Sequence, residues 1–264
     1  MNVSAIAQLQ RDALARLSRL HGEHELHSAV LALIVPRESM ASIDAWEAEI
    51  AALGTSDTIG ADVSCLTDAT RLPCLEALLD RMRALPKAQR RTLLQAVRRV
   101  MAAHSPLRPL DRLHWLLMRR KLSDDPPVLA PEPEAHSELA ELPQSSLDRI
   151  ASVTAYLARM VPTGDAAAGR EWYAEALGSA ADPLRLPPCR APDGDGLARA
   201  LVDVEALPWM MRPVLLRAWV EAALSTSQRA RLLPMAADAL RRAAGLLNSP
   251  LPPELARHYD ELDW

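Results

Sequence analysis

Apolar residues recur every three or four positions along almost the whole chain, and this spacing restricts the fold more than any other feature. Near the amino terminus the pattern comprises Ile6, Leu9, Ala13, Leu14 and Leu17. Such spacing gives each helix one apolar stripe that faces a core. The apolar residues are mostly Leu, Ala, Val and Met, and Phe is absent, whereas sheets favour aromatic and β-branched side chains. The sequence therefore predicts an all-α fold.

Prolines, glycines and polar clusters divide this pattern into separate helices, because a proline removes a backbone donor and restricts the residue before it. We expect helices at about residues 3–20, 24–35, 38–53, 57–69, 72–84, 87–103, 109–122, 137–161, 165–178, 197–206, 209–224 and 227–247. A loop rich in Pro and Gly is expected from Asp182 to Gly196. Pro250, Pro252 and Pro253 end the last long helix.

One segment, residues 123–136, has the composition of a linker rather than of a helix. It carries four prolines and several acids, namely Asp124, Asp125, Pro126, Pro127, Pro131, Glu132, Pro133 and Glu134. A chain of 264 residues is long enough for two ordinary domains. We therefore predict an N-terminal helical domain at 1–122 and a C-terminal helical domain at 137–264.

An internal repeat joins the two sides of this linker. The first copy reads Ala84-Leu85-Pro86, then Arg90, Leu93-Leu94 and Ala96, and the second reads Ala206-Leu207-Pro208, then Arg212, Leu215-Leu216 and Ala218. The offset is 122 residues at every matched position, and in both copies the proline is expected to open a helix. A period of this length favours a duplicated domain over a solenoid. A chance match is the alternative, since Ala, Leu and Arg are common in this chain.

Two stretches carry a resemblance to a known family. They are Arg71-Leu72-Pro73-Cys74-Leu75-Glu76-Ala77-Leu78-Leu79 with Arg83-Ala84-Leu85-Pro86 and Gln89, and Leu240-Arg241-Arg242-Ala243 with Asn248-Ser249-Pro250-Leu251-Pro252-Pro253. Both resemble the helical cytoplasmic tail of bacterial membrane-bound zinc metalloproteases of the HtpX and CAAX-prenyl-endopeptidase type. The similarity runs from about residue 5 to 255. Each half of such a tail also resembles the TerB-like helical fold, which implies two related helical-bundle halves.

The resemblance does not extend to the family's chemistry. A zinc peptidase places two His one helical turn apart in His-Glu-x-x-His, and no such pattern occurs in this chain. TerB-like domains have an acidic, metal-holding turn, but here the matching turn is Ala103-His104-Ser105 with Asp111 alone, and the second copy has no acid between Ser225 and Asp238. Because a hard cation needs several oxygen ligands, no metal is expected.

Other catalytic and metal-binding patterns are also missing. His21, His24 and His27 follow one another at three-residue steps, and on a helix they would offer at most two ligands to one ion. Cys65 and Cys189 have spacings that suit no disulfide framework, and with Cys74 we expect them to be buried free thiols. No Gly-x-Ser-x-Gly elbow and no phosphate-binding glycine loop occur. We expect neither an enzyme nor a cofactor.

Positive charge is concentrated between Arg81 and Lys121, where twelve Lys and Arg face the single acid Asp111, in a chain whose net charge is −4. The candidate partner surface in this segment comprises Lys87, Arg90, Arg91, Arg98 and Arg99, here called the basic stripe. The stripe can pair with the acidic remainder of the chain, particularly with the acids just beyond it, Asp124, Asp125, Glu132, Glu134, Glu138 and Glu141. It can instead meet a protein partner or the anionic inner face of a membrane. Nucleic acid is disfavoured, because no binding motif accompanies the charge and the pI is about 6.0.

Most of the six tryptophans occupy positions expected in the core. Trp264 is the exception, and we expect it either to dock on its own chain or to anchor a partner. The longest apolar run, residues 29–35, is too short to cross a bilayer, and the first residues lack the pattern of a secretory signal. The sequence thus predicts a cytoplasmic, non-catalytic helical module for protein–protein interaction. The alternatives are a protease-associated tail that supports proteolysis in trans, and a binder of anionic surfaces.

Overall fold

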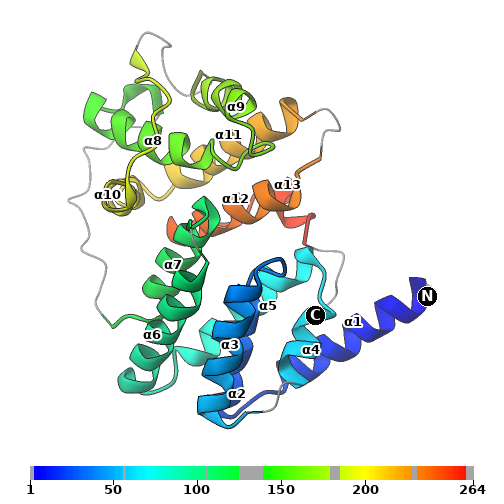
Figure 1. The fold of residues 1–264 in the computed structure, drawn as a ribbon. Coiled ribbons are helices and arrows are strands. Elements are labelled where there is room, and N and C mark those ends of the chain that lie inside the picture. The colour runs from blue at the N-terminus through cyan, green and yellow to red at the C-terminus, as the bar shows by residue number, and fades with distance from the viewer. Residues whose placement is uncertain are drawn as a thin grey trace. The chain divides into compact units, whose positions relative to one another are not determined.

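The computed structural model describes residues 3–55, 58–104, 106–124, 139–178, 185–227 and 231–259, and these residues form helices and no strand (Figure 1). The all-α prediction is confirmed. Among the described residues, no helix has both the length and the apolar character needed to span a bilayer. The chain divides into two compact units, Met1–Asp125 and Pro126–Trp264. This division falls inside the segment whose prolines predict a linker, and residues 125–138 themselves lie outside the described part of the chain.

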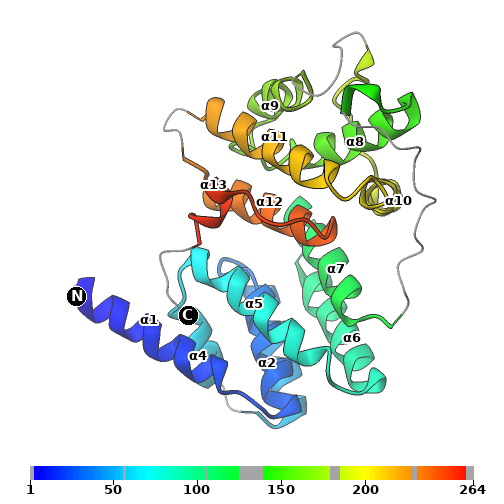
Figure 2. The same cartoon turned by 180° about the vertical axis from the view of Figure 1, so that it is seen from behind.

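Unit 1 is built around one helix that is buried on all sides. The described helices are α1 (Val3–Ser18), α2 (Glu23–Ile34), α3 (Met40–Leu53), α4 (Thr58–Ser64), α5 (Asp68–Met82), α6 (Lys87–Ala103) and α7 (Pro109–Leu122). Every residue of α2 from Leu26 to Ile34 is buried. The helix contacts α3, α4, α5 and α6, and Figure 2 shows α4, α5 and α6 near it. A helix that is apolar all round can be stable only in such a central place.

The boundary between α4 and α5 differs from the prediction of helices at 57–69 and 72–84. The break lies at residues 65–67, and Pro73 is buried inside α5. The reason lies in the first turn of α5, where Thr67 occupies the N-cap position and Asp68 places a negative charge beside the positive end of the helix dipole. This start signal determines where the helix begins, and Pro73 removes only one internal donor.

The described residues of unit 2 form a short 3-10 helix, η1 (Leu139–Glu141), and six α-helices. They are α8 (Gln144–Leu157), α9 (Ala166–Gly178), α10 (Gly194–Glu205), α11 (Met211–Ser225), α12 (Pro234–Leu246) and α13 (Pro253–Ala256). The prediction of one helix at 137–161 is wrong at its start, because Pro143 is the N-cap residue of α8. The last long helix begins only at Pro234, and Pro253 opens α13, which the sequence did not predict.

The helices of the two units pack on corresponding partners. In unit 1, α2 packs on α3 and α5, α3 packs on α6, and α6 packs on α7. In unit 2, α8 packs on α9 and α10, α9 packs on α11, and α11 packs on α12. These packings follow the same chain order in both units, while in unit 1 α2 also packs on α4 and α6, and α5 also packs on α7.

The start of the repeated helix differs between the units. Pro86 is the N-cap residue of α6, as the repeat predicts. Pro208 instead precedes a turn, in which the Met211 backbone N–H donates to the Pro208 carbonyl at 2.8 Å, and α11 begins only at Met211. Residues 208–210 are therefore presented in a turn rather than on the side of a helix.

Buried tryptophans hold the core of unit 2 together. Trp172 and Trp219 are both fully buried. The Trp172 Nε1–H donates to the Trp219 carbonyl at 3.0 Å, and the Trp219 Nε1–H donates to the Thr154 hydroxyl at 3.0 Å. These bonds link α9, α11 and α8 while they satisfy the polar atoms of the rings. In unit 1, Trp46 of α3 is likewise buried, and its Nε1–H donates to the Ser28 carbonyl at 3.3 Å.

Candidate functional site

The basic stripe of α6 contains one residue that faces inward. Arg90 is only 9% exposed. Its Nη1 donates to the Leu122 carbonyl at 3.0 Å, at the end of α7, and its Nη2 contacts the Asp124 carboxylate. Arg212 does the same in unit 2, where its Nη1 donates to the Leu247 carbonyl at the end of α12, also at 3.0 Å. A cation at a helix C-terminus satisfies unpaired carbonyls and the dipole. Arg90 therefore does not belong to the exposed surface that its spacing predicts.

Two more residues of the stripe are paired within the chain. Lys87 Nζ lies 3.2 Å from Asp124 Oδ2. The hydrogen bond from Arg90 and then that from Lys87 lower the pKa of Asp124. Arg99 binds Glu49 of α3 with both sides of its guanidinium, Nη2 at 2.8 Å, and this hydrogen bond lowers the pKa of Glu49. Internal pairing is the first of the three interpretations of the stripe, and it holds for these side chains.

The remaining residues of the candidate surface are Arg91, Arg98 and Trp264. Arg91 and Arg98 are exposed on α6. The Arg98 guanidinium carbon lies 5.7 Å from the centre of the Trp115 ring, in a cation–π arrangement. Trp264 lies outside the described residues. The outward part of the basic stripe is thus smaller than its sequence suggests.

A different exposed surface occurs where α11 begins. Trp209 is 70% exposed, Met210 64% and Val214 53%. These three residues are called the α11 apolar surface below. The sequence prediction missed it, because tryptophans at helical spacing were assigned to the core. The repeat contains a signal that would have found it: the offset of 122 places Trp209 at the position of Lys87, which is exposed.

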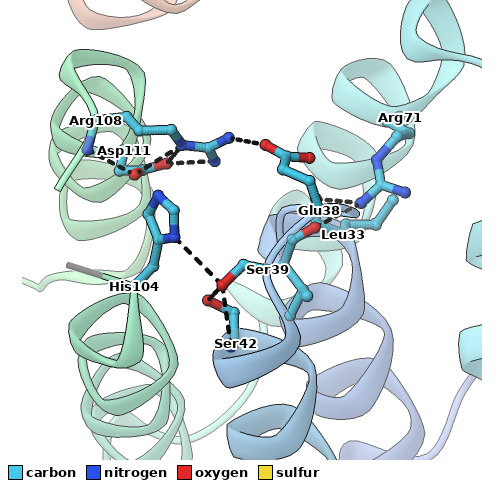
Figure 3. Close-up of polar contacts among 9 residues, drawn as sticks. Leu33, Glu38, Ser39, Ser42, Arg71, His104, Arg108 and Asp111 are labelled. Atoms are coloured by element: carbon cyan, nitrogen blue, oxygen red, sulfur yellow. Dashed lines mark hydrogen bonds and ion pairs between the residues drawn. The ribbon is translucent and has the colours of Figure 1, made fainter. Parts of the chain in front are cut away.

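A polar cluster joins the turn before α3 to the turn between α6 and α7 (Figure 3). Ser39 caps α3, where its hydroxyl accepts a hydrogen bond from the Ser42 backbone N–H at 3.2 Å and donates to the Ser42 hydroxyl at 3.0 Å. His104 Nδ1 lies 3.3 Å from the same Ser39 oxygen. Arg108 connects the turns a second time, through its Nη1 at 3.0 Å from Glu38 Oε1.

Asp111 is the single acid between Arg81 and Lys121, and its charge is balanced by a neighbouring arginine. The carboxylate is buried and accepts from the Arg108 backbone N–H at 3.0 Å and from Arg108 Nη2 at 2.8 Å. Figure 3 shows the Arg108 guanidinium between the carboxylates of Asp111 and Glu38. Within the described ranges, no three His, Cys, Asp or Glu side chains gather closely enough to hold a metal ion.

Ser39, His104 and Asp111 are residue types of a hydrolytic triad, but their geometry serves another purpose. A nucleophilic serine must direct its hydroxyl proton at the base. Here the Ser39 hydroxyl donates to Ser42 and caps α3. Asp111 is engaged by Arg108. The cluster therefore clamps two turns together and offers no activated nucleophile.

The three histidines at residues 21, 24 and 27 do not converge. His21 and His24 are exposed, whereas His27 is 3% exposed inside unit 1. Burial lowers the pKa of His27 to about 4, and the nearby Glu49 opposes this shift. Its Nε2 has no hydrogen-bond partner in the part of the chain that the structure describes. The ring is therefore neutral at physiological pH.

The cysteines are free, as predicted, but only one is buried. Cys74 lies in the core of unit 1, where burial raises the pKa of its thiol to about 12. Cys65 is exposed and Cys189 half-buried. The prediction that all three are buried is wrong for Cys65, because α4 ends at Ser64 and turns that residue outward.

Comparisons with protein-family models, with curated proteins and with solved structures find no match for this chain. The resemblance to metalloprotease tails and to TerB-like domains therefore stays a prediction.

Proposed function

We propose that this chain is a non-catalytic helical module that binds a protein partner through the α11 apolar surface. One observation carries the proposal, the exposure of Trp209 beside Met210 and Val214. Trp and Met are enriched at protein interfaces, and a tryptophan is among the residues that contribute most to binding. A cluster of exposed large apolar side chains costs solubility unless a partner covers it.

The two units are, in this proposal, related halves produced by duplication. Three features support this view: the offset of 122 in the repeat, the corresponding order of helix packing, and the matched bonds of Arg90 and Arg212 to helix-end carbonyls. The TerB-like character of the halves is part of the same proposal. Duplication leaves one copy free to change its surface while the shared core keeps the fold.

A protein partner is favoured over an anionic surface because of how the charges are used. Arg90 is buried, and Lys87 and Arg99 have carboxylate partners in the chain. Of the five stripe residues, only Arg91 and Arg98 are exposed without a carboxylate partner among the described residues, and two exposed cations on one helix give little affinity for a membrane or a nucleic acid at physiological salt. The protease-associated alternative would make the catalytic part of such an enzyme the partner.

The test is affinity capture from the native host followed by mass spectrometry. The variant replaces Trp209, Met210 and Val214 together by Ala. We expect the wild-type chain to enrich a specific protein and the triple variant to lose it, while helix content and thermal unfolding stay unchanged. Retention of the same protein by the folded triple variant would overturn the proposal.

A matched control lies on unit 1. Ile6 and Leu9 of α1 are exposed large apolar residues, at 45% and 48%. Replacing both by Ala removes exposed apolar surface from unit 1 and leaves α11 unchanged. We expect this double variant to capture the partner as the wild type does. If both sets of substitutions lower capture equally, binding follows general apolar exposure and not this surface.

A further inference from the structure

Unit 1 contains a pocket that the protein-binding surface does not use. The cavity is about 320 Å³ and lies between the end of α2, the middle of α3, α4 and the start of α5. Its lining includes Ala32, Val35, Ile43 and Trp46 on the apolar side, and Arg37 among the charged residues. This size falls at the lower end of the range of about 300–1,000 Å³ that is usual for small-molecule sites.

The apolar wall of the pocket is held rigidly. The Trp46 ring is buried, and its Nε1–H donates to the Ser28 carbonyl at 3.3 Å. On the other side the ring lies against Gly60 of α4, where an added Cβ would stand 2.3 Å from a ring carbon. Glycine at this position lets α4 approach the indole closely. A wall fixed in this way loses little entropy when a ligand binds.

The positive charge of the pocket comes from Arg37. Its Nη2 donates to the Leu66 carbonyl, which fixes the guanidinium. Its Nη1 lies 3.8 Å from Asp68 Oδ1, and the two side chains are 49% and 65% exposed. Such a long, exposed pair is weak. Because a guanidinium has five N–H groups, Arg37 retains donors that can bind a carboxylate.

A second arginine, Arg71, covers backbone carbonyls that would otherwise repel an anion in the pocket. The pocket lies at the C-terminus of α2, where exposed carbonyls would repel negative charge. Arg71 Nη2 covers them, with donor distances of 3.2 Å to the Ala32 carbonyl, 3.1 Å to Leu33 and 3.3 Å to Val35, and Figure 3 shows its bond to Leu33. Glu47 stands in the lining and disfavours a second negative charge on a ligand.

We propose that this pocket binds a small amphiphilic monocarboxylate. The carboxylate lies on the Arg37 guanidinium, and a short alkyl or aromatic body packs on Val35, Ile43 and Trp46. Charge-assisted hydrogen bonds at Arg37 orient the molecule, and burial of its apolar body against the fixed indole gives most of the affinity. This site is independent of the α11 apolar surface.

The test uses three probes of equal chain length, octanoate, octan-1-ol and octan-1-amine, on the full chain. The readout is the indole N–H resonance of Trp46, identified by its loss in Trp46→Phe, together with calorimetry. We expect saturable binding of octanoate at millimolar concentration or below, with octanol at least roughly tenfold weaker, which corresponds to the loss of a charge-assisted bond, and no binding of the amine.

Three variants make the result decisive. Arg37→Gln should weaken octanoate binding about tenfold and leave octanol unchanged. Ala61→Leu, which fills the pocket from α4, should abolish both. Asp68→Asn removes the competing carboxylate and should tighten octanoate binding. No shift of the Trp46 resonance at millimolar octanoate, equal binding of the three probes, or undiminished octanoate binding by folded Arg37→Gln would each overturn the proposal.

Discussion

The starts of α6 and α11 occupy matching positions of the sequence repeat, but the exposed residues are basic at the start of α6 and apolar at the start of α11. At this position unit 1 has Lys87, followed by the exposed Arg91, and unit 2 has the exposed Trp209 and Met210. Beneath them the interiors agree: Leu93 and Leu215 are both fully buried, and an arginine in each unit reaches the end of the next helix. Core packing restricts which residues can occupy the buried positions of a helix, while the exposed positions can change to residues that bind a partner.

The difference extends to the turns at the ends of the bundles. In unit 1 the turn before α3 is joined to the turn before α7 by Glu38 and Arg108. In unit 2 an apolar contact joins the start of α12 to the turn before α9, because Met235 lies so close to Gly164 that an added Cβ would stand 2.5 Å from the methionine methyl carbon. Gly164 also has a φ of +77°, which favours glycine. An ion pair thus joins these turns in unit 1, and close apolar packing makes the contact in unit 2.

The largest effects should come from the shared core. Leu93→Ala and Leu215→Ala should each lower the free energy of unfolding of their own unit by about 3 kcal/mol, because each leaves a cavity in a fully buried place. Native-state hydrogen exchange reads each unit separately. The neighbours sharpen the comparison: Leu94 is only partly buried, whereas Leu216 is fully buried. Leu94→Ala should therefore cost less than Leu216→Ala, and equal costs would contradict the burial difference.

Acid should lower the stability of unit 1 more than that of unit 2. The pKa of His27 is lowered to about 4 in the folded chain from 6.5, so between these values the unfolded chain binds the proton more readily. The stability of unit 1 is thus complete above pH 6.5 and decreases as pH falls toward 4, by on the order of 3 kcal/mol. His27→Gln should flatten this dependence. Arg149, which follows His27 by the same offset of 122 residues, is exposed and pairs with Asp203 at 3.0 Å, so unit 2 should lack this step.

Substitution of Arg90 and Arg212, which each bind a carbonyl at a helix end, should lower the free energy of unfolding by smaller and unequal amounts. Arg90→Ala removes bonds to both Leu122 and Asp124 and should destabilise unit 1 by about 2 kcal/mol. Arg212→Ala removes the bond to Leu247 and should cost unit 2 about 1 kcal/mol. Arg91→Ala is the control, since Arg91 is exposed, and should change stability by less than about 0.5 kcal/mol. Denaturant titration with hydrogen exchange as the readout would show whether this order holds.

The smallest stability change is expected at the α11 apolar surface. Replacing Trp209, Met210 and Val214 by Ala should leave the unfolding of unit 2 within about 0.5 kcal/mol of wild type, because these side chains contact solvent more than the core. A loss of several kcal/mol, measured by thermal unfolding, would mean that the surface packs within the chain.

The sequence predicted what depends on local pattern and missed what depends on packing. Helical periodicity is enough to give the all-α class. Thr67 followed by the acid Asp68 also indicates where α5 begins, but the predicted start was placed next to Pro73 instead. Pairing with Asp124 was among the expectations, but the inward turn of Arg90 depends on the carbonyl of Leu122, which only the packing of α7 on α6 brings close. Trp209 was missed because residue type alone favoured the core, although the repeat placed it at an exposed position. The cytoplasmic location stays a prediction.

Hydrogen–deuterium exchange of the chain alone and with its captured partner tests the central claim most directly. The account predicts that the partner protects residues 208–217, which contain the α11 apolar surface, and leaves the exposed face of α6 around Arg91 unchanged. Protection confined to α6, with none around Trp209, would contradict it.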